Sequence, residues 1–133
     1  MTRPNIGMDY TVLDCPDPAA LASFYVQVLE WKSVRDEDDW HVIEGPGGER
    51  LAFQLAPDFV PVDWPTSGVG IHLDLLVDSL DPAEAWVISL GAQRVTGIPE
   101  HQTFRVYRDP VGHHFCLCLR GWGPTRPDLV DRG

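Results

Sequence analysis

Positive charge is scarce in this sequence. Ten lysine and arginine residues face 20 aspartate and glutamate residues, which gives a formal net charge of −10, and Lys32 is the only lysine. A chain this acidic repels phosphate backbones and anionic lipid headgroups. We therefore expect neither a nucleic acid nor a membrane surface to be its partner.

Long apolar runs are also missing. No run approaches the roughly 20 residues that a membrane-spanning helix needs, and the first ten residues, MTRPNIGMDY, lack the apolar core of a secretory signal. The chain has three cysteines, Cys15, Cys116 and Cys118, and an odd number without an export signal argues against a disulfide framework. These features predict a cytoplasmic protein.

The material for a hydrophobic core is present. Hydrophobic residues make up 44 % of the 133 residues and include five Trp, five Phe and three Tyr. A chain of this length suits one compact domain, or two small halves that share a core.

The chain resembles two copies of one unit. Asp14 lies 64 positions before Asp78, and further pairs of residues recur at the same spacing. The further matches are residues 17–19 with 81–83, Pro46 with Pro110, Gly48 with Gly112, and Leu55 with Leu119. A repeat of this kind predicts two similar supersecondary units.

Each copy contains one expected helix and four expected strands. Alternating β-rich runs predict strands at 6–14 and 69–78, and helices follow at 18–31 and 82–92, with Asp17 and Asp81 as N-caps before proline. A short strand and a hairpin complete each copy, and the second hairpin turns at 109–112. We expect one domain over 1–120, with module one at 6–57, a proline-rich linker at 58–68, module two at 69–120 and a tail at 121–133.

Three segments follow one another in the chain: DPAALASFYVQVLEW (17–31), HLDLLVDSLDPAEAWVISLGA (72–92) and DPVGHHFCLCL (109–119). In this order they resemble the vicinal oxygen chelate superfamily, which includes glyoxalases, bleomycin-resistance proteins and extradiol dioxygenases. The resemblance is to a glyoxalase-like subgroup and implies an α+β fold. Its tandem βαβββ modules would form a cup of curved mixed sheets with helices on the convex side. It further implies a small-molecule ligand and a homodimer, with module swapping left open.

Strand alternation predicts which side chains of module two face the cup. His72 and Asp74 share one face of their strand, and Cys116 and Cys118 share a face with His114. Pairing across the 109–112 turn then sets Arg105 opposite Cys116 and Tyr107 opposite His114.

The same reasoning applies to module one. It places Met8, Tyr10, His41, Ala52 and Gln54 toward the cup. The opposite row, which we expect to face the helix, consists of Trp40, Val42, Leu51 and Phe53.

The resemblance implies that a metal-using member would hold a divalent ion with His and Glu ligands. His72 occupies such a ligand position. The equivalent position in the first copy of the repeat is Met8, and Cys116 occupies the position where the resemblance implies a Glu. Hard cations prefer oxygen ligands. We therefore expect no metal cofactor, and if one binds, His72 and Cys116 are the candidates for a zinc site.

Three functions fit these observations. The first is a glyoxalase-like protein, with catalysis left open, in which His72 and Asp74 act as a general base and Arg105 holds an anionic substrate. The second is a resistance-type protein that sequesters a drug without turnover, and the third is a metal-dependent lyase, isomerase or dioxygenase. The simpler readings are a half-buried structural His72, apolar packing roles for Cys116 and Cys118, and a salt bridge for Arg105.

Overall fold

The computed structural model describes residues 2–63, 68 and 70–121. The chain divides into two compact units, Met1–Phe59 and Val60–Gly133. Two parts of the prediction lie outside the described residues. They are residues 64–67 of the predicted linker and the predicted tail from residue 122 onward. No helix in the described part of the chain is long and apolar enough to cross a bilayer.

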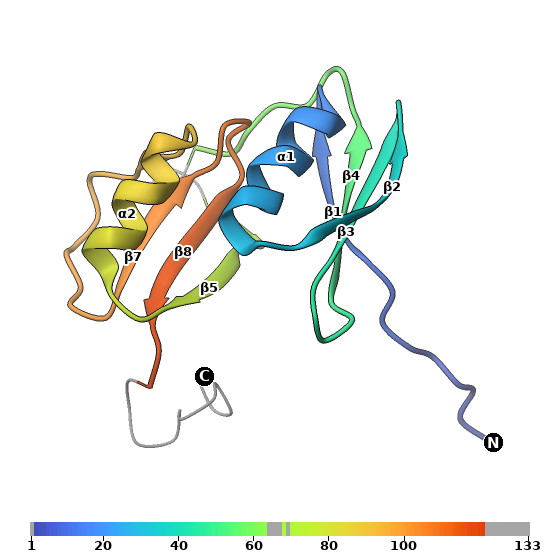
Figure 1. The fold of residues 1–133 in the computed structure, drawn as a ribbon, viewed down its shortest axis with the longest axis horizontal. Coiled ribbons are helices and arrows are strands. Elements are labelled where there is room, and N and C mark those ends of the chain that lie inside the picture. Colours follow the sequence, from blue (N-terminus) through green and yellow to red (C-terminus); the bar gives the residue numbers. More distant parts are fainter. Residues whose placement is uncertain (1, 64–67, 69, 122–133) are drawn as a thin grey trace. The chain divides into compact units, whose positions relative to one another are not determined.

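The two units have the same order of elements (Figure 1). The first contains β1 (Thr11–Cys15), α1 (Pro18–Leu29), β2 (Lys32–Glu37), β3 (Trp40–Glu44) and β4 (Arg50–Leu55). The second contains β5 (Leu73–Val77), α2 (Leu80–Ser89), β6 (Gln93–Arg94), β7 (Phe104–Arg108) and β8 (His114–Leu119). This arrangement confirms the predicted α+β class with two βαβββ modules.

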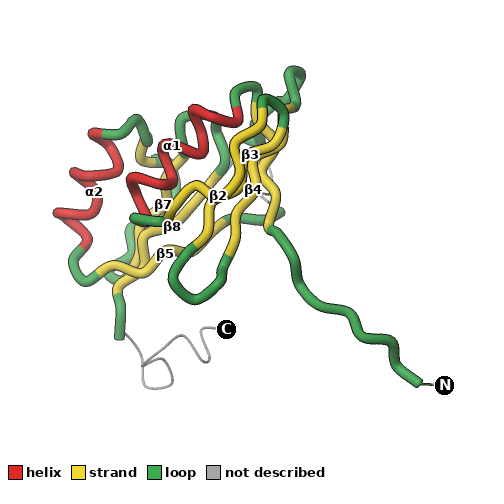
Figure 2. Tube along the Cα trace, turned by 45° about the vertical axis from the view of Figure 1, so that its right-hand side comes forward, coloured by secondary structure: helices red, strands yellow, loops and turns green. Residues whose placement is uncertain are grey.

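The two sheets also share one topology. Their strand orders are β1-β4-β3-β2 and β5-β8-β7-β6. In each sheet the first strand pairs in parallel with the last, and the remaining pairs are antiparallel. Among the described residues, each unit has one helix, which Figure 2 shows beside the strands. We call the opposite face of each sheet the helix-free face.

Both first strands begin later than the sequence predicts. β1 begins at Thr11 rather than at residue 6, and β5 begins at Leu73 rather than at residue 69. Thr11 pairs with Leu51, and β4 itself begins only one residue earlier, at Arg50. Residues 6–9 therefore lie beyond the start of β4 and have none of that strand to pair with.

The two helices begin in different ways. Asp17 caps α1 as predicted, since its side chain accepts a hydrogen bond from the Ala20 N–H at 3.2 Å. The predicted cap of α2 is wrong: Ser79 is the N-cap, and Asp81 lies in the first turn. The Asp81 carboxylate instead contacts Arg105 Nη2 at 2.9 Å. The Asp-Pro pattern predicted that this carboxylate would cap the helix, but it forms an ion pair with an arginine of β7 instead.

Aromatic packing holds α1 to its sheet. Tyr25 of α1 and Phe53 of β4 are both fully buried and stack with ring centroids 5.9 Å apart. Phe24 packs edge-on against Tyr25. Burial of such large side chains supplies most of the stabilisation of a small unit.

Charged side chains link α2 to its sheet in addition to the buried Leu80 and Val87. Glu84 of α2 accepts a hydrogen bond from the Tyr107 hydroxyl at 2.7 Å, and its Oε1 lies 3.3 Å from Arg94 Nη1 and from Arg105 Nη1. Burial of Tyr107 and its bond to Glu84 raise the pKa of the phenol above its ordinary value. Glu84 thus links α2 to both β6 and β7.

We predict that Glu84→Gln destabilises the chain by about 1–3 kcal/mol, because it leaves two guanidinium groups without their shared carboxylate. Urea unfolding monitored by circular dichroism measures the free energy of unfolding. Glu100→Gln is the matched control, since the Glu100 side chain is 84 % exposed and contacts only Arg94 of the same group. Equal stability of the two variants would contradict the assigned role of Glu84.

Candidate functional site

The register of the second hairpin decides which side chains reach the helix-free face. Arg105 pairs with Leu117, and Tyr107 pairs with Phe115. The predicted pairing, which set Arg105 opposite Cys116, is therefore wrong by one residue. Arg105 and Tyr107 point toward α2, where Glu84 binds both.

The turn itself explains the shift. Asp109 Oδ1 accepts hydrogen bonds from the backbone N–H groups of Val111, Gly112 and His113 at 2.9–3.0 Å. The Asp109 N–H donates to the His113 carbonyl at 2.8 Å, and Gly112 adopts φ 113°. The connection therefore spans 109–113, one residue more than the predicted turn.

This register brings a different arginine to the helix-free face. Arg108 pairs with His114, and Val106 pairs with Cys116. Arg108 was not among the predicted site residues. A sequence signal could have identified Arg108. An aspartate followed three residues later by glycine favours a longer connection, and a five-residue connection over Asp109–His113 places Arg108 on this face.

The first hairpin also differs from the prediction. His41 pairs with Phe53, whose ring stacks on Tyr25 of α1, so His41 faces the helix. Trp40 pairs with Gln54, and Val42 pairs with Ala52, on the opposite side. Hydrophobicity could not separate the two faces of β3, because its three central residues are all buried.

The remaining predicted residues of module one make separate contacts. Tyr10 packs edge-on against Trp40, with centroids 5.5 Å apart, and the Arg50 guanidinium lies 4.8 Å from the centre of the Tyr10 ring. Gln54 donates a hydrogen bond to Asp14. Met8 precedes β1 and is 85 % exposed, so the structure gives it no position on the sheet.

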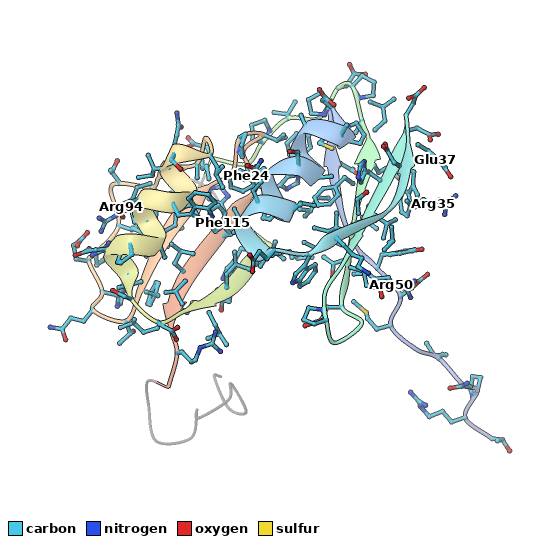
Figure 3. All side chains as sticks on the ribbon, in the orientation of Figure 1. Phe24, Arg35, Glu37, Arg50, Arg94 and Phe115 are labelled. Atoms are coloured by element: carbon cyan, nitrogen blue, oxygen red, sulfur yellow. The ribbon has the colours of Figure 1, made fainter. Side chains whose placement is uncertain are left out.

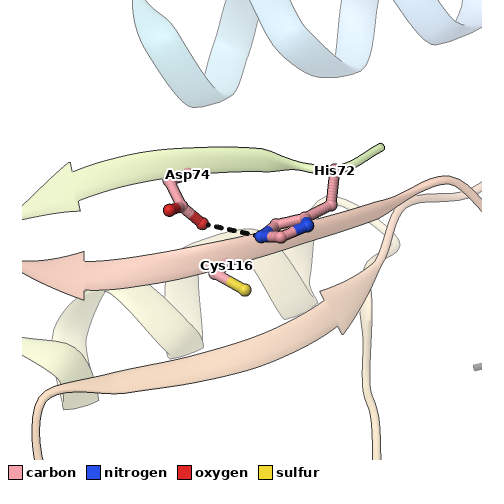
Figure 4. A group of neighbouring side chains, drawn as sticks. All are labelled: His72, Asp74 and Cys116. Carbon is pink, nitrogen blue, oxygen red and sulfur yellow. Dashed lines mark ion pairs between the residues drawn. The ribbon is translucent and has the colours of Figure 1, made fainter. Parts of the chain in front are cut away.

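The predicted pair His72 and Asp74 does come together, and Cys116 joins it (Figure 4). His72 directly precedes β5, Asp74 lies in β5, and Asp74 pairs with Cys116 of β8. His72 Nε2 lies 3.1 Å from Asp74 Oδ1, and one ligand atom from each of the three residues falls within 4.8 Å of the others. This group is the candidate functional site.

The part of the site open to solvent is the imidazole and the carboxylate. Their side chains are 35 % and 29 % exposed, whereas Cys116 is 3 % exposed. Cys116 and Cys118 belong to a hydrophobic cluster. Its other members are Val95 and Val106, with Ile98 and Phe104 packed against it.

The carboxylate determines which nitrogen of His72 can act as a base. A carboxylate only accepts hydrogen bonds, so Asp74 favours the tautomer with its proton on Nε2. Nδ1 of His72 then carries the lone pair. The pair has the arrangement of an oriented general base.

The neighbouring groups are held in their neutral forms. Burial raises the pKa of the Cys116 thiol to about 12, and Cys118 adds to the effect. Burial lowers the pKa of His114, and the positive charge of Arg108 lowers it further. At neutral pH the site therefore contains a thiol and a neutral imidazole beside the His72–Asp74 pair.

The donor set fits a divalent metal poorly. Hard cations require several oxygen ligands, and this group offers one carboxylate. A softer ion such as zinc would need the Cys116 thiolate, which burial disfavours. The group therefore offers one imidazole, one carboxylate and one buried thiol that would have to lose its proton to bind zinc.

We predict that lowering the pH from about 7 to about 5 reduces the free energy of unfolding, in part through His114. Because the folded chain holds this pKa below 6.5, the unfolded chain binds the proton more readily. The stabilisation from the neutral imidazole is present above the unfolded pKa and is lost as the pH falls below it. Urea unfolding across this range measures the slope.

His114→Gln should flatten this pH dependence, whatever its effect on stability at neutral pH. His101→Gln is the control, since His101 is exposed. An unchanged slope in the His114 variant would contradict the prediction.

We predict that protein purified without chelator carries less than one equivalent of zinc, manganese or iron, because the site supplies a buried thiol in place of oxygen ligands. Elemental analysis of the purified chain measures the content. One zinc per chain that disappears in Cys116→Ser would show that the site does bind metal.

The comparisons with known proteins agree with this fold. The model of the glyoxalase-like domain family matches residues 10–118, and the chain belongs to this family. No curated protein matches the sequence.

Solved structures show the same fold at low identity. A glyoxalase/bleomycin resistance protein/dioxygenase family enzyme from Burkholderia phytofirmans PsJN aligns with a TM-score of 0.66 at 18 % identity, over 83 % of this chain and 95 % of that one. A glyoxalase-related enzyme from Fulvimarina pelagi gives 0.65 at 20 %, over 89 % and 91 %. The fosfomycin resistance protein FosX from Listeria monocytogenes gives 0.67 at 13 %, over 90 % and 97 %.

Proposed function

We propose that this chain binds a small organic molecule on the helix-free face of its second unit and that His72 accepts a proton from it. The observation that carries the proposal is the 3.1 Å contact between His72 Nε2 and Asp74 Oδ1 at the start of β5. The contact orients the imidazole, and the 35 % exposure of His72 leaves the ring accessible to a ligand. Membership of the glyoxalase-like family supports a small-molecule ligand.

Arg108 replaces Arg105 as the cationic group of this proposal. Arg108 lies on the same face as Cys116 and Asp74, and its side chain is 28 % exposed. Its Nη2 lies 3.4 Å from Asp63, whose side chain is 74 % exposed. An exposed ion pair of this kind is weak, so an oxyanion of the ligand can compete with Asp63 for the guanidinium.

A second candidate is sequestration without turnover. The net charge of −10 attracts cationic compounds. One structural neighbour is described as a fosfomycin resistance protein, and another, from Albidiferax ferrireducens T118, as a glyoxalase/bleomycin resistance protein. Metal-dependent chemistry is the third candidate, and the donor set at Cys116 disfavours it.

We predict that His72→Ala lowers turnover of any substrate by about 100-fold or more, while Arg108→Ala weakens its binding by about tenfold. A thermal-shift screen of small organic acids, phosphonates and cationic amines identifies ligands, and calorimetry with product analysis then separates affinity from turnover. His101→Ala is the matched control for loss of an exposed histidine.

The outcomes divide the candidates. Tight one-to-one binding of a cationic compound with no product favours sequestration. Ligands whose affinity and conversion are unchanged in both His72→Ala and Arg108→Ala would remove this face as the site.

A further inference from the structure

The first unit contains a second group of chemically active side chains, on strands β2 and β3. Ser33 Oγ lies 2.8 Å from His41 Nε2, within hydrogen-bond distance. His41 Nδ1 lies 3.3 Å from Asp36 Oδ1, at an ion-pair distance and without hydrogen-bond geometry. A hydroxyl, an imidazole and a carboxylate therefore follow one another in the order that activates a serine nucleophile.

A β-bulge makes this arrangement possible. Residues three apart on a regular strand point to opposite faces, yet Ser33 and Asp36 both contact His41. The register against β3 shifts between Ser33 and Arg35: Ser33 pairs with Ile43, whereas Arg35 pairs with Val42 and Asp36 with His41. The extra residue reverses the alternation and turns Ser33 and Asp36 to one side, a use of bulges that is common beside active sites.

The two residues that flank Asp36 on β2 stay out of the group. Arg35 and Glu37 pair with each other, Nε to Oε2 at 2.8 Å, and project from β2 (Figure 3). They lie opposite Val42 and Trp40, on the helix-free face. Asp36 is therefore the carboxylate of β2 that is directed at His41.

The burial pattern suits a nucleophile. The His41 side chain is 10 % exposed and the Asp36 side chain 75 %. Ser33 is exposed and lies on β2, an edge strand in the sheet of the described residues. The base is thus shielded while the hydroxyl remains accessible to a reagent.

The chemistry of the contacts sets the proton positions. The negative charge of Asp36, 3.3 Å from Nδ1, favours the tautomer with a proton on that nitrogen through electrostatic attraction rather than through a hydrogen bond. Nε2 then carries a lone pair and accepts the hydrogen bond that the Ser33 hydroxyl donates. This direction of the hydrogen bond is the one that a general base requires.

We infer that Ser33, His41 and Asp36 form an acyl-transfer site that accepts acyl groups from activated esters, separate from the His72 site. Ser33 Oγ bonds to the acyl carbon as its proton passes to His41 Nε2, and the bond from that carbon to the leaving oxygen breaks. The leaving group departs as an alkoxide or phenolate and takes up the proton. Water then attacks the acyl-serine, which restores the hydroxyl and releases the acid.

The test uses the full chain and p-nitrophenyl acetate. We expect nitrophenolate release above buffer, which Ser33→Ala lowers by at least about tenfold. Ser23→Ala is the matched control, because Ser23 is exposed on α1 and contacts only Gln27. Circular dichroism confirms folding, and Ser33→Cys, which keeps a nucleophile, should still be acetylated.

Mass spectrometry locates the acetyl group. Lys32 is adjacent, so the adduct is treated with hydroxylamine, which removes an ester from Ser33 but leaves an amide on Lys32. A hydroxylamine-labile adduct on Ser33 supports the site. An adduct on Lys32 alone, an unchanged rate in Ser33→Ala, or no release above buffer would each overturn it.

Asp36 is a positioning residue, and its role is tested separately. Asp36→Asn should slow acetylation of Ser33, whereas Asp36→Glu, which keeps a carboxylate, should restore part of the rate. Equal rates in the two variants would show that Asp36 does not act on His41.

Discussion

The Asp109 carboxylate in the second hairpin determines which side chains of β7 lie on each face of the sheet. Asp109 accepts three backbone N–H groups and sets the connection between β7 and β8 at five residues. Side chains on a strand alternate between faces, so a connection one residue shorter would exchange the two faces of β7. Arg105 and Tyr107 would then leave α2, and Arg108 would leave the face of His72. The attachment of the helix and the composition of the site follow from the same turn.

The two halves of the repeat use equivalent positions for different purposes. His41 in β3 and Arg105 in β7 lie 64 positions apart and both face the helix of their own unit. In the second unit this position contributes to the ionic group around Glu84 that holds α2. In the first unit aromatic stacking holds α1, so His41 is available to contact Ser33 and Asp36. A duplicated fold can thus change chemistry at one position when another interaction carries the packing.

The sequence predicts the order of elements well, because Asp-Pro pairs and glycines lie within a few residues of the same boundaries in both halves. It also predicts the approach of His72 and Asp74, since side chains two positions apart on an extended segment point to the same side in any register. It fails for Arg105, Tyr107 and His41, because their faces depend on how many residues each hairpin connection contains. It does not predict the Ser33 group, because the bulge at β2 is a property of the pairing with β3 rather than of the β2 sequence.

The topology gives the His72 site a distinct place in folding. A short connection joins β7 to β8. In contrast, α2, β6 and β7 separate β5 from β8 in the sequence, although β5 and β8 pair in parallel. Contacts between segments distant in the chain cost more loop entropy and form later. Asp74 reaches Cys116 only through this parallel pairing. Local detachment of β5 would therefore separate His72 and Asp74 from Cys116 while the β7–β8 hairpin stays intact.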